Sequence, residues 1–293
     1  MRIKRRKDSL TALLFLLPSL GVFWLFIIFP VATSLILSLC KWDILRQPEF
    51  VGFDNFTRLF HDPIFWEALR NTFYYIGGYT PLSLVGALGL ASLMNKSIRG
   101  LVIYRTAYFM PVISTWVAVA LVWRWLYNPE IGAINYILSF IGIKGPAWLE
   151  DMNWAMPGVI FASVWKDLGF NMVILLAGLQ AISPFLYEVA DIDGASAWKK
   201  FAHITLPMLS PAIFFLLVIS LINSFQVFDQ IYVMTRGGPA GATSVLVFQI
   251  YQHAFNYLKM GYAAAISWIL FILVFIATAI QIRYQRYWVQ YGE

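Results

Sequence analysis

Six long apolar stretches limit what this 293-residue chain can fold into more than any other feature of its sequence. A helix needs about 20 mainly apolar residues to cross the hydrocarbon core of a membrane. In lipid, such a helix satisfies every backbone hydrogen bond within its own segment. We therefore expect an all-α integral membrane protein with about six transmembrane helices. The stretches cover residues 10–39, 71–94, 101–127, 154–181, 207–231 and 260–282.

Composition agrees with this fold class and excludes several others. The chain is 60% hydrophobic and 12% charged, whereas about a quarter of the residues in a soluble domain are charged. The net charge is +6, and the Lys and Arg residues lie near the ends of the apolar stretches. This placement is typical of charges that set membrane topology and not of a nucleic-acid-binding domain. The single cysteine, Cys40, excludes an internal disulfide, and the three histidines have no metal-ligand spacing. We expect no catalytic, metal or nucleic-acid site.

The distribution of Lys and Arg predicts the orientation. With the N-terminus inside, the inner segments carry twelve of these residues and the outer loops carry seven. Both termini are therefore expected in the cytoplasm. The start, MRIKRRKDSL (1–10), resembles a signal peptide, but the uncharged run from Ser9 to Cys40 is too long for one and predicts a retained anchor.

This topology divides the chain into three parts. Residues 1–70 form an N-terminal anchor span with its outer loop, 71–285 form the membrane core, and 286–293 form a cytoplasmic tail. In the second outer loop, IGAINYILSFIGI (131–143) has a helical apolar pattern but is too short to cross the membrane. We expect an interfacial helix there.

A polar segment, EVADIDGASAWKKFAHITLP (188–207), separates the fourth and fifth spans on the cytoplasmic side. Ser183-Pro184 predicts a helix start, and Asp193-Gly194 predicts its end. A second short helix is expected over 195–203, with Pro207 beginning the fifth span. On these features alone, an interfacial helix on lipid headgroups and a protein-docking surface fit equally well; the small residues around the turn favour docking.

The segment resembles the EAA signature of the membrane subunits of bacterial ATP-binding-cassette (ABC) importers. That signature reads EAA, three residues, G, nine residues, I, one residue, LP. The one departure is Val189, where alanine is usual. The matching residues are Glu188, Ala190, Gly194, Ile204, Leu206 and Pro207.

Other stretches resemble the carbohydrate-uptake branch (maltose/glycerol-3-phosphate type) of the same permeases, and together they cover most of the chain from about residue 50. The resemblance implies a type I ABC importer transmembrane domain in the bacterial cytoplasmic (inner) membrane. The stretches are FDNFTRLFHDPIFWEALRNT (53–72), YRTAYFMPVIS (104–114), WRWLYNPEIGAIN (123–135), LAGLQAISP (176–184), TRGGPAGATSVLV (235–247) and GYAAAISW (261–268).

The resemblance also implies partners. Loop 182–207 would be the coupling helix that sits in a groove of a cytoplasmic ATPase. The importer would contain a second homologous EAA permease, two ABC ATPases and an extracytoplasmic sugar-binding protein. The chain has no G-x-x-x-x-G-K-[ST], so ATP and Mg would be used by the ATPases, with no cofactor bound here. Expected docking residues are Glu188, Val189, Ala190, Asp193, Gly194, Ala195, Trp198, Leu206 and Pro207.

Polar residues inside spans are costly and usually face a partner or a water-filled path. Polar clusters occur in the third, fourth and fifth stretches, 101–127, 154–181 and 207–231. The resemblance implies a transient sugar site midway across these spans. Alternatives stay open: Lys166 and Asp167 could form a structural ion pair, and Asn223 could bridge neighbouring helices. We expect the remaining tryptophans and tyrosines at the membrane interfaces. The candidate pathway residues are Trp116, Trp165, Asp167, Gly169, Asn171, Asn223, Gln226 and Asp229.

The leading prediction is a non-catalytic permease subunit that carries a di- or oligosaccharide and forms half of the translocation pathway. A glycerol-3-phosphate-type permease is the alternative within the family. An ion-coupled secondary transporter would require internal repeats and membrane carboxylates, for which Asp167 and Asp229 are the two candidates. A membrane glycosyltransferase would require a cluster of acids or a metal site at one membrane face, and the sequence offers none.

Overall fold

The computed structural model describes residues 15–96 and 100–290, and most of these residues are helical. The chain forms two compact units, Met1–Asp62 with Ile250–Ile269 (unit 1) and Pro63–Gln249 with Leu270–Glu293 (unit 2). Unit 1 thus includes residues 250–269, which the predicted division by topology grouped with the core. The predictions for residues 1–14 and for Arg99 lie outside the described residues.

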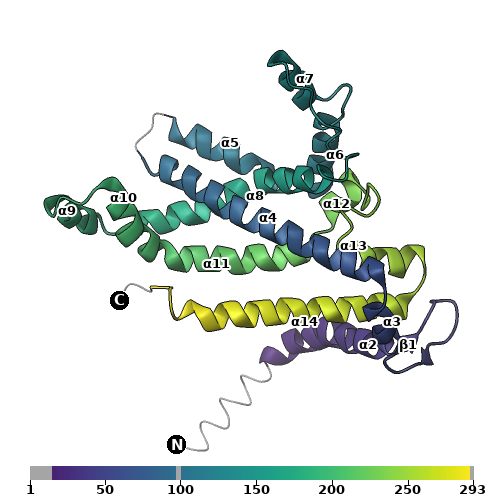
Figure 1. Cartoon of the computed structure of the whole chain (residues 1–293). Helices are drawn as coiled ribbons and strands as arrows, with labels where there is room; N and C mark the ends of the chain where they lie inside the picture. The colour runs from purple at the N-terminus through teal and green to yellow at the C-terminus, as the bar shows by residue number, and fades with distance from the viewer. Residues whose placement is uncertain (1–14, 97–99, 291–293) are drawn as a thin grey trace, which may run out of the picture. The chain divides into compact units, whose positions relative to one another are not determined.

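Three long helices form the centre of unit 2: α4 (Pro63–Met94), α8 (Ala155–Gln180) and α11 (Leu206–Phe225). They lie against one another, and α5 (Leu101–Ile113) packs on α8 (Figure 1). Small residues allow this close packing, as in other membrane helix bundles. The backbone of α5 at Tyr108 lies so close to Gly169 of α8 that a side chain there would overlap it.

The third predicted span is not one straight helix. α5 ends at Ile113, and α6 (Trp116–Leu126) begins three residues later, with a bend of 103° between them. Ser114 and Thr115 are extended, and the Thr115 Oγ1 accepts a hydrogen bond of 3.4 Å from the amide of Ala118. The prediction of a continuous span over 101–127 was wrong, because apolar length alone does not reveal an extended pair inside the segment.

The fifth predicted span, 207–231, also differs at both of its ends. α10 (Ala197–Lys200) and the wide turn η2 (Phe201–Thr205) continue directly into α11, giving one helix over Ala197–Phe225. Pro207 therefore lies inside one continuous helix and does not start a new one. Its missing N–H leaves a gap in the helical hydrogen bonds, which the wide turn before it accommodates. At the other end, the chain turns at Gln226 and α12 (Asp229–Met234) follows.

The shorter helices of unit 2 connect these spans. α7 (Ala133–Phe140) confirms the short helix predicted within residues 131–143. α9 (Pro184–Ile192) confirms the first helix of the polar segment, and α13 (Leu246–Tyr251) leads into unit 1.

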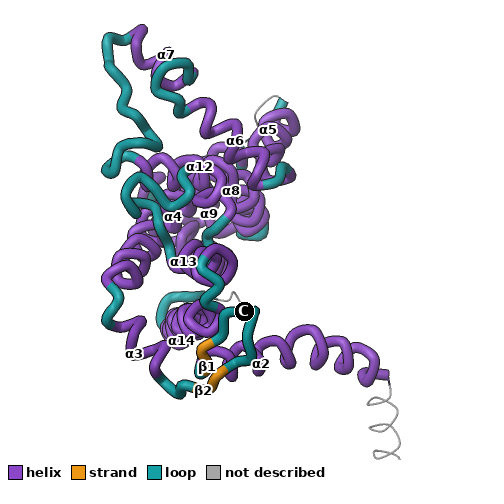
Figure 2. The backbone as a smooth tube through the Cα atoms, turned by 90° about the vertical axis from the view of Figure 1, so that its right-hand side faces the viewer, coloured by secondary structure: helices purple, strands orange, loops and turns teal. Residues whose placement is uncertain are grey.

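Unit 1 contains the N-terminal helix Phe15–Ser38, which includes η1 (Trp24–Ile28) and α2 (Phe29–Ser38). A two-stranded antiparallel ribbon follows, formed by β1 (Cys40–Lys41) and β2 (Glu49–Phe50) and visible in Figure 2. The remaining elements are α3 (Asp54–Phe60), η3 (Gln252–Asn256) and the start of α14 (Met260–Gln285).

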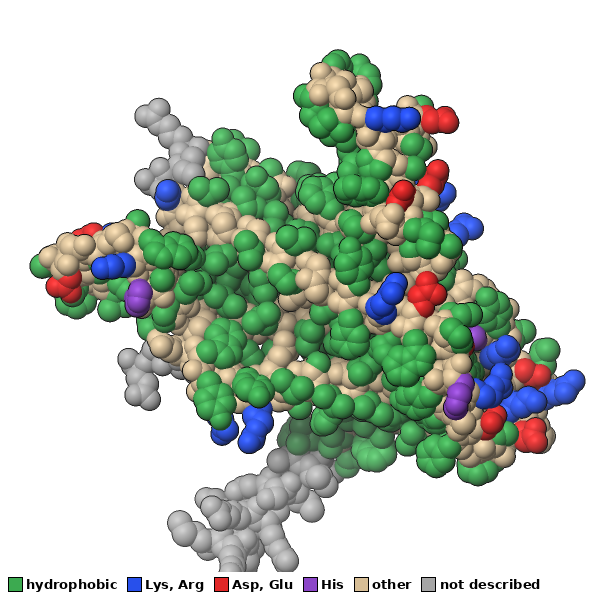
Figure 3. Space-filling model, in the orientation of Figure 1, with side chains coloured by type: hydrophobic (Ala, Val, Ile, Leu, Met, Phe, Trp, Pro, Cys, Tyr) green, Lys and Arg blue, Asp and Glu red, His purple; other side chains and the backbone are tan. Residues whose placement is uncertain are grey.

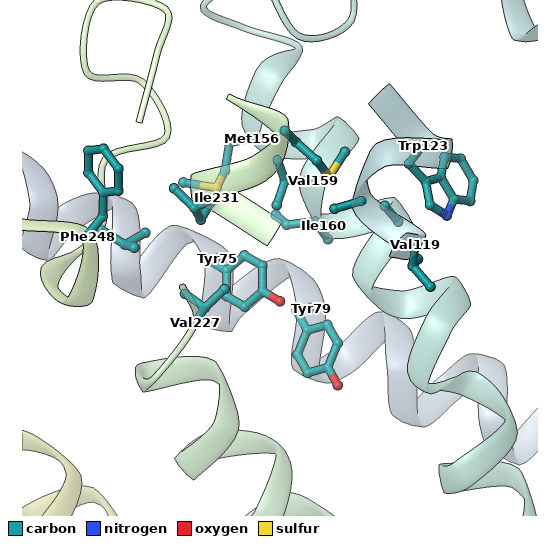
Figure 4. Close-up of a cluster of buried hydrophobic side chains, with 14 of the residues drawn as sticks. Tyr75, Tyr79, Val119, Trp123, Met156, Val159, Ile160, Val227, Ile231 and Phe248 are labelled. Carbon is teal, nitrogen blue, oxygen red and sulfur yellow. The ribbon is translucent and has the colours of Figure 1, made fainter. Parts of the chain in front are cut away.

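The described residues contain five helices long and apolar enough to cross a membrane, or six if the bent pair α5–α6 counts as one span. This agrees with the predicted class and span number. The buried hydrophobic side chains of unit 2 form two clusters. One surrounds Tyr75 and Tyr79 (Figure 4), and the other joins Leu176 and Leu179 of α8 to Leu209 of α11.

Candidate functional site

The two helix breaks, at Ser114-Thr115 and after Phe225, border one cavity of about 340 Å³ in unit 2. A broken helix exposes backbone polar groups, so it is tolerated at membrane depth only where it lines a cavity or is buried in protein. Side chains from α4, α6, α8, the end of α11, the turn after it and the start of α12 surround the space. They are Tyr75, Tyr79, Trp116, Asp167, Asn223, Gln226, Val227, Phe228, Asp229 and Gln230.

Asp167 is held in place on one wall of the cavity. The Tyr79 hydroxyl donates a hydrogen bond of 2.7 Å to its Oδ2. The ring of Tyr79 stacks on that of Tyr75, with centroids 5.5 Å apart and planes 7° apart, as Figure 4 shows. The Gln230 Nε2 in turn donates a bond of 3.1 Å to the Tyr75 hydroxyl. These bonds orient the carboxylate and leave it further acceptor positions for a ligand.

Trp116 is positioned by a buried cation. The Lys166 ammonium lies 4.9 Å from the centre of the Trp116 ring and 3.4 Å from the carbonyl oxygen of Val112. Val112 is in the last turn of α5, where carbonyl groups have no partner within the helix. Lys166 is only 5% exposed, and no carboxylate oxygen lies within 4.0 Å of its nitrogen among the described residues. It therefore tethers the bend between α5 and α6 and does not form an ion pair with Asp167.

The predicted pathway residues fall into two groups. Five line the cavity: Trp116, Asp167, Asn223, Gln226 and Asp229. The other three lie outside it. The Trp165 ring packs edge-on against Trp123, Gly169 faces Tyr108 of α5, and the Asn171 Nδ2 donates a bond of 2.7 Å to the Ser83 hydroxyl, which joins α8 to α4.

Tyr75 and Tyr79 were not among the predicted pathway residues, because tyrosines were expected at the membrane interfaces. A signal was present. The two residues are four apart within the second span, so they share one helix face, and that face lies well inside the apolar stretch. Phe228 and Gln230 were not among the predicted pathway residues, although Gln226 and Asp229 of the same segment were.

Gly169 provides a test that separates packing from cargo contact. In Gly169→Ala, the new methyl group would overlap the Tyr108 carbonyl oxygen and lie 2.9 Å from the Phe109 Cα. Overpacking of this kind typically costs 1–3 kcal/mol, so we expect at least about 1 kcal/mol of lost stability and a Tm lower by a few degrees. Thermal unfolding of the purified chain in detergent measures it.

Gly89→Ala is the matched control, because a methyl group at Gly89 of α4 meets no atom within 4 Å. Its Tm should stay level or rise slightly, since alanine favours a helix over glycine. Equal behaviour of the two variants would contradict the packing role assigned to Gly169.

The cavity has the chemistry of a site for hydroxyl-rich molecules. Aromatic rings present apolar faces, the carboxylates of Asp167 and Asp229 accept hydrogen bonds from hydroxyls, and the amides of Asn223 and Gln226 both donate and accept. None of the lining residues is basic. Asn223, Gln226 and Asp229 are exposed in the single chain, so the cavity is open on their side.

The polar segment forms a second site, a helix–turn–helix. α9 begins with Pro184 after Ser183, as predicted, and ends at a Schellman motif. In that motif the Ala195 amide donates a hydrogen bond of 2.9 Å to the Ala190 carbonyl, and the Gly194 amide donates one of 3.1 Å to the Asp191 carbonyl. Gly194 has a φ of 71°, the left-handed conformation predicted for it, which other residues adopt only with strain.

Side-chain bonds hold the two helices of this loop together. The Lys200 ammonium pairs with the Asp191 carboxylate at 2.7 Å, and the hydroxyls of Tyr187 and Thr205 lie 2.9 Å apart. The Ser196 hydroxyl caps α10 by accepting a bond from the Lys199 amide. Tyr187 also packs against the cluster of α8 and α11, so the loop is anchored on the membrane core.

The predicted docking residues divide by exposure. Glu188, Val189, Asp193, Gly194 and Trp198 are exposed, whereas Ala190, Ala195, Leu206 and Pro207 are half-buried. The most exposed apolar side chain of the loop was not among the predicted docking residues: Ile192 is 86% exposed, compared with 73% for Trp198. Charged side chains gather around α9 and α10, while hydrophobic side chains cover most of the face over α4 and α11 (Figure 3).

Comparison with known proteins identifies the family. The family described as "Binding-protein-dependent transport system inner membrane component" matches residues 83–286. YesP of Bacillus subtilis, a probable ABC transporter permease protein, is 38% identical over 291 residues, covering 98% of this chain and 94% of YesP. LacF of Rhizobium radiobacter, a lactose transport system permease protein, is 35% identical over 283 residues, 94% of each chain.

UgpA of Yersinia enterocolitica, an sn-glycerol-3-phosphate transport system permease protein, is 36% identical over 282 residues, 95% of each chain. The fold matches a chain of a bacterial alginate ABC transporter, crystallised with an alginate pentasaccharide-bound periplasmic protein. The TM-score is 0.86, with 26% identity over 99% of each chain. This chain therefore belongs to the binding-protein-dependent inner membrane components, the multi-pass permease subunits of ABC transporters.

Proposed function

We propose that this chain is a permease subunit of an ATP-driven importer for a neutral di- or oligosaccharide, and that the cavity at the two helix breaks is its cargo site. The observation that carries the proposal is the convergence of Trp116, Asp167 and Asp229 on one space from three separate helices. The relatives support a saccharide cargo: LacF belongs to a transport system for lactose, a neutral disaccharide, and the structural neighbour belongs to a transporter of alginate, an acidic polysaccharide.

The charge of the cavity favours a neutral sugar over glycerol 3-phosphate. A phosphate group would meet the carboxylates of Asp167 and Asp229, with no arginine to bind it bidentately. The nearest cation, the Lys166 ammonium, is engaged by the Trp116 ring and the Val112 carbonyl. Glycerol 3-phosphate is the second candidate cargo, because UgpA, a permease of an sn-glycerol-3-phosphate system, is 36% identical to this chain.

The proposed importer has further subunits. A second EAA permease would close the open side of the cavity, where Asn223, Gln226 and Asp229 are exposed. Two cytoplasmic ATPases would bind ATP and Mg, and an extracytoplasmic binding protein would deliver the sugar. This chain would itself be non-catalytic and hold no metal or cofactor, with its termini in the cytoplasm.

One helix supports a mechanism that links the ATPases to the cargo. The helix Ala197–Phe225 runs unbroken from the coupling loop to the cavity, a length of about 43 Å. Lys200, near its start, pairs with Asp191 of α9, while Gln226 directly follows its end. Closure of the ATPases would move the loop, and the rigid helix would carry that motion to the cavity wall.

Asp167→Asn tests the cargo site. The variant keeps the shape of the side chain but replaces charge-assisted hydrogen bonds, which contribute about 1.5–3 kcal/mol each, with weaker ones. We expect uptake of a neutral disaccharide into proteoliposomes to fall about tenfold, with ATPase activity unchanged. The assay compares a panel of neutral saccharides with sn-glycerol 3-phosphate.

Glu130→Gln is the control, because it makes the same acid-to-amide change at an exposed position outside the cavity. Its uptake should equal that of the wild type. Normal sugar uptake by Asp167→Asn would remove Asp167 from the site. Uptake of glycerol phosphate alone by the wild type would overturn the proposed cargo class.

A further inference from the structure

Unit 1 contains a cavity of about 310 Å³ that the cargo site does not use. It lies between the end of α3, the turn η3 and the first turn of α14. Its lining side chains are all polar or ionisable, and four of the six are of basic types. They are Arg58, His61, Asp62, His253, Lys259 and Tyr262. We name this the basic pocket.

The positive charges of the basic pocket outnumber its one carboxylate. That acid, Asp62, accepts a bond of 2.8 Å from the Tyr262 hydroxyl. The two permanent cations lie over tyrosine rings, Arg58 at 5.9 Å from the centre of the Tyr262 ring and Lys259 at 6.0 Å from the centre of the Tyr257 ring.

His253 adds an unused polar atom to the basic pocket. Its Nδ1 is buried and has no hydrogen-bond partner within the part of the chain that the structure describes. Burial lowers the pKa of its imidazole, Lys259 and Arg58 lower it further, and Asp62 opposes them. Lys259 and Arg58 thus lie close enough to act on this side chain. A buried polar atom without a partner in a native protein requires an explanation, and a bound group can supply one.

The residues of the basic pocket lie in or next to two segments, 41–70 and 232–259, that follow the first and fifth predicted spans. The distribution of Lys and Arg predicts that both segments are outside the membrane. With the termini in the cytoplasm, as the proposed function requires, these segments are on the side of the binding protein.

We propose that the basic pocket receives an acidic side chain of the extracytoplasmic binding protein. This rests on the proposed function and adds the contact by which the binding protein is recognised. A carboxylate has the charge and geometry that Arg58 binds through two parallel hydrogen bonds, with Lys259 as a second positive charge. Such complementary charges chiefly determine association rate and specificity.

The test uses the complete importer, reconstituted in lipid nanodiscs with its second permease, ATPases and binding protein. ATPase activity is measured as the binding protein is titrated. Lys259→Glu and Arg58→Glu should each raise the half-maximal binding-protein concentration about tenfold, whereas basal activity and the maximal rate should not change. Added salt should weaken the wild-type interaction more than that of either variant, because a charge pair is screened.

Lys144→Glu is the matched control, since it reverses an exposed charge in the predicted outer loop after α7 that does not line the pocket. It should shift the half-maximal concentration far less. A binding-protein variant with an Asp or Glu changed to Lys should restore the affinity of Lys259→Glu, and a scan of surface acids identifies that residue.

Three results would overturn the inference. The half-maximal concentration could match that of Lys144→Glu, the maximal rate alone could fall, or the variants could change the KM for cargo at saturating binding protein, which would indicate a cargo subsite. Failure of the proposed function is distinguishable, because the wild-type importer would then show no stimulation by the binding protein.

Discussion

Gly194→Val should disconnect this permease from its ATPases while leaving the membrane core folded. Gly194 has a φ of 71°, and a side chain there would meet no atom within 4 Å. The cost is therefore conformational: a non-glycine residue in the left-handed region loses roughly 1–2 kcal/mol, and a β-branched one is a marked outlier there. The Schellman motif that turns α9 into α10 should open, and the exposed side chains of Ile192 and Trp198 should lose their arrangement.

We expect the affinity for the ATPase to fall about thirtyfold, and ATP-driven uptake to fall with it. The measurements are co-purification, binding of the isolated ATPase to the permease in nanodiscs, and uptake. Gly142→Val is a close control, because Gly142 has a φ of 76° and equally open surroundings outside the coupling loop. If both variants lost the ATPase, general misfolding would be the cause; if neither did, docking would not depend on the turn.

A charge reversal on the same loop gives an independent check. Glu188 is exposed on α9 and has no structural bond to lose among the described residues, so Glu188→Lys should leave the loop folded. Loss of ATPase binding in this variant would therefore report direct contact. Normal binding would limit the docking surface to Gly194 and the apolar side chains near it.

The polar loop could be predicted from sequence because its signals are local. Ser183-Pro184 and Asp193-Gly194 determine helix ends through their own backbone preferences, and α9 begins and ends where they indicate. The spans followed from apolar length in the same way. The continuation of α10 into α11 was not predicted. It depends on the wide turn before Pro207, and no single residue type in that turn indicates its hydrogen-bond pattern.

The cavity could be predicted only in part, because it depends on contacts between distant segments. The polarity of Asp167, Gln226 and Asp229 inside apolar spans was a sufficient signal for these residues. Tyr79 was not predicted, since its role arises from the hydrogen bond to Asp167, 88 positions away. The break after Phe225 was also hidden, because Val227, Phe228 and Ile231 keep the segment apolar enough to extend the predicted span past it.

Lys166 shows how a membrane-buried charge can serve structure and transport together. Taking an ammonium out of water is costly, and a pairing carboxylate would be the usual compensation. Here the compensation comes from the Val112 carbonyl at the end of α5 and the face of Trp116 at the start of α6. One side chain on α8 therefore contacts both sides of the bend, and it orients the indole that lines the cavity.

Lys166→Met should consequently impair transport without unfolding the protein. Methionine keeps the length and apolar volume of the side chain but removes the charge. It forfeits a desolvated cation–π contact of about 2 kcal/mol, so uptake should fall roughly thirtyfold. Because the indole would lose its fixed position, the tryptophan fluorescence change on adding sugar should also shrink. Thermal unfolding of the variant provides the check on folding.

Lys166→Arg separates positioning from bulk, because a guanidinium keeps the positive charge and stacks well on an indole ring. Arginine should restore much of the uptake that methionine loses, with the KM for sugar recovering before the maximal rate. The order follows from the geometry: the charge first returns Trp116 to the cavity, and the larger head group then limits how the bend between α5 and α6 can move. A methionine variant with normal uptake and a normal fluorescence change would show that packing alone sets the bend.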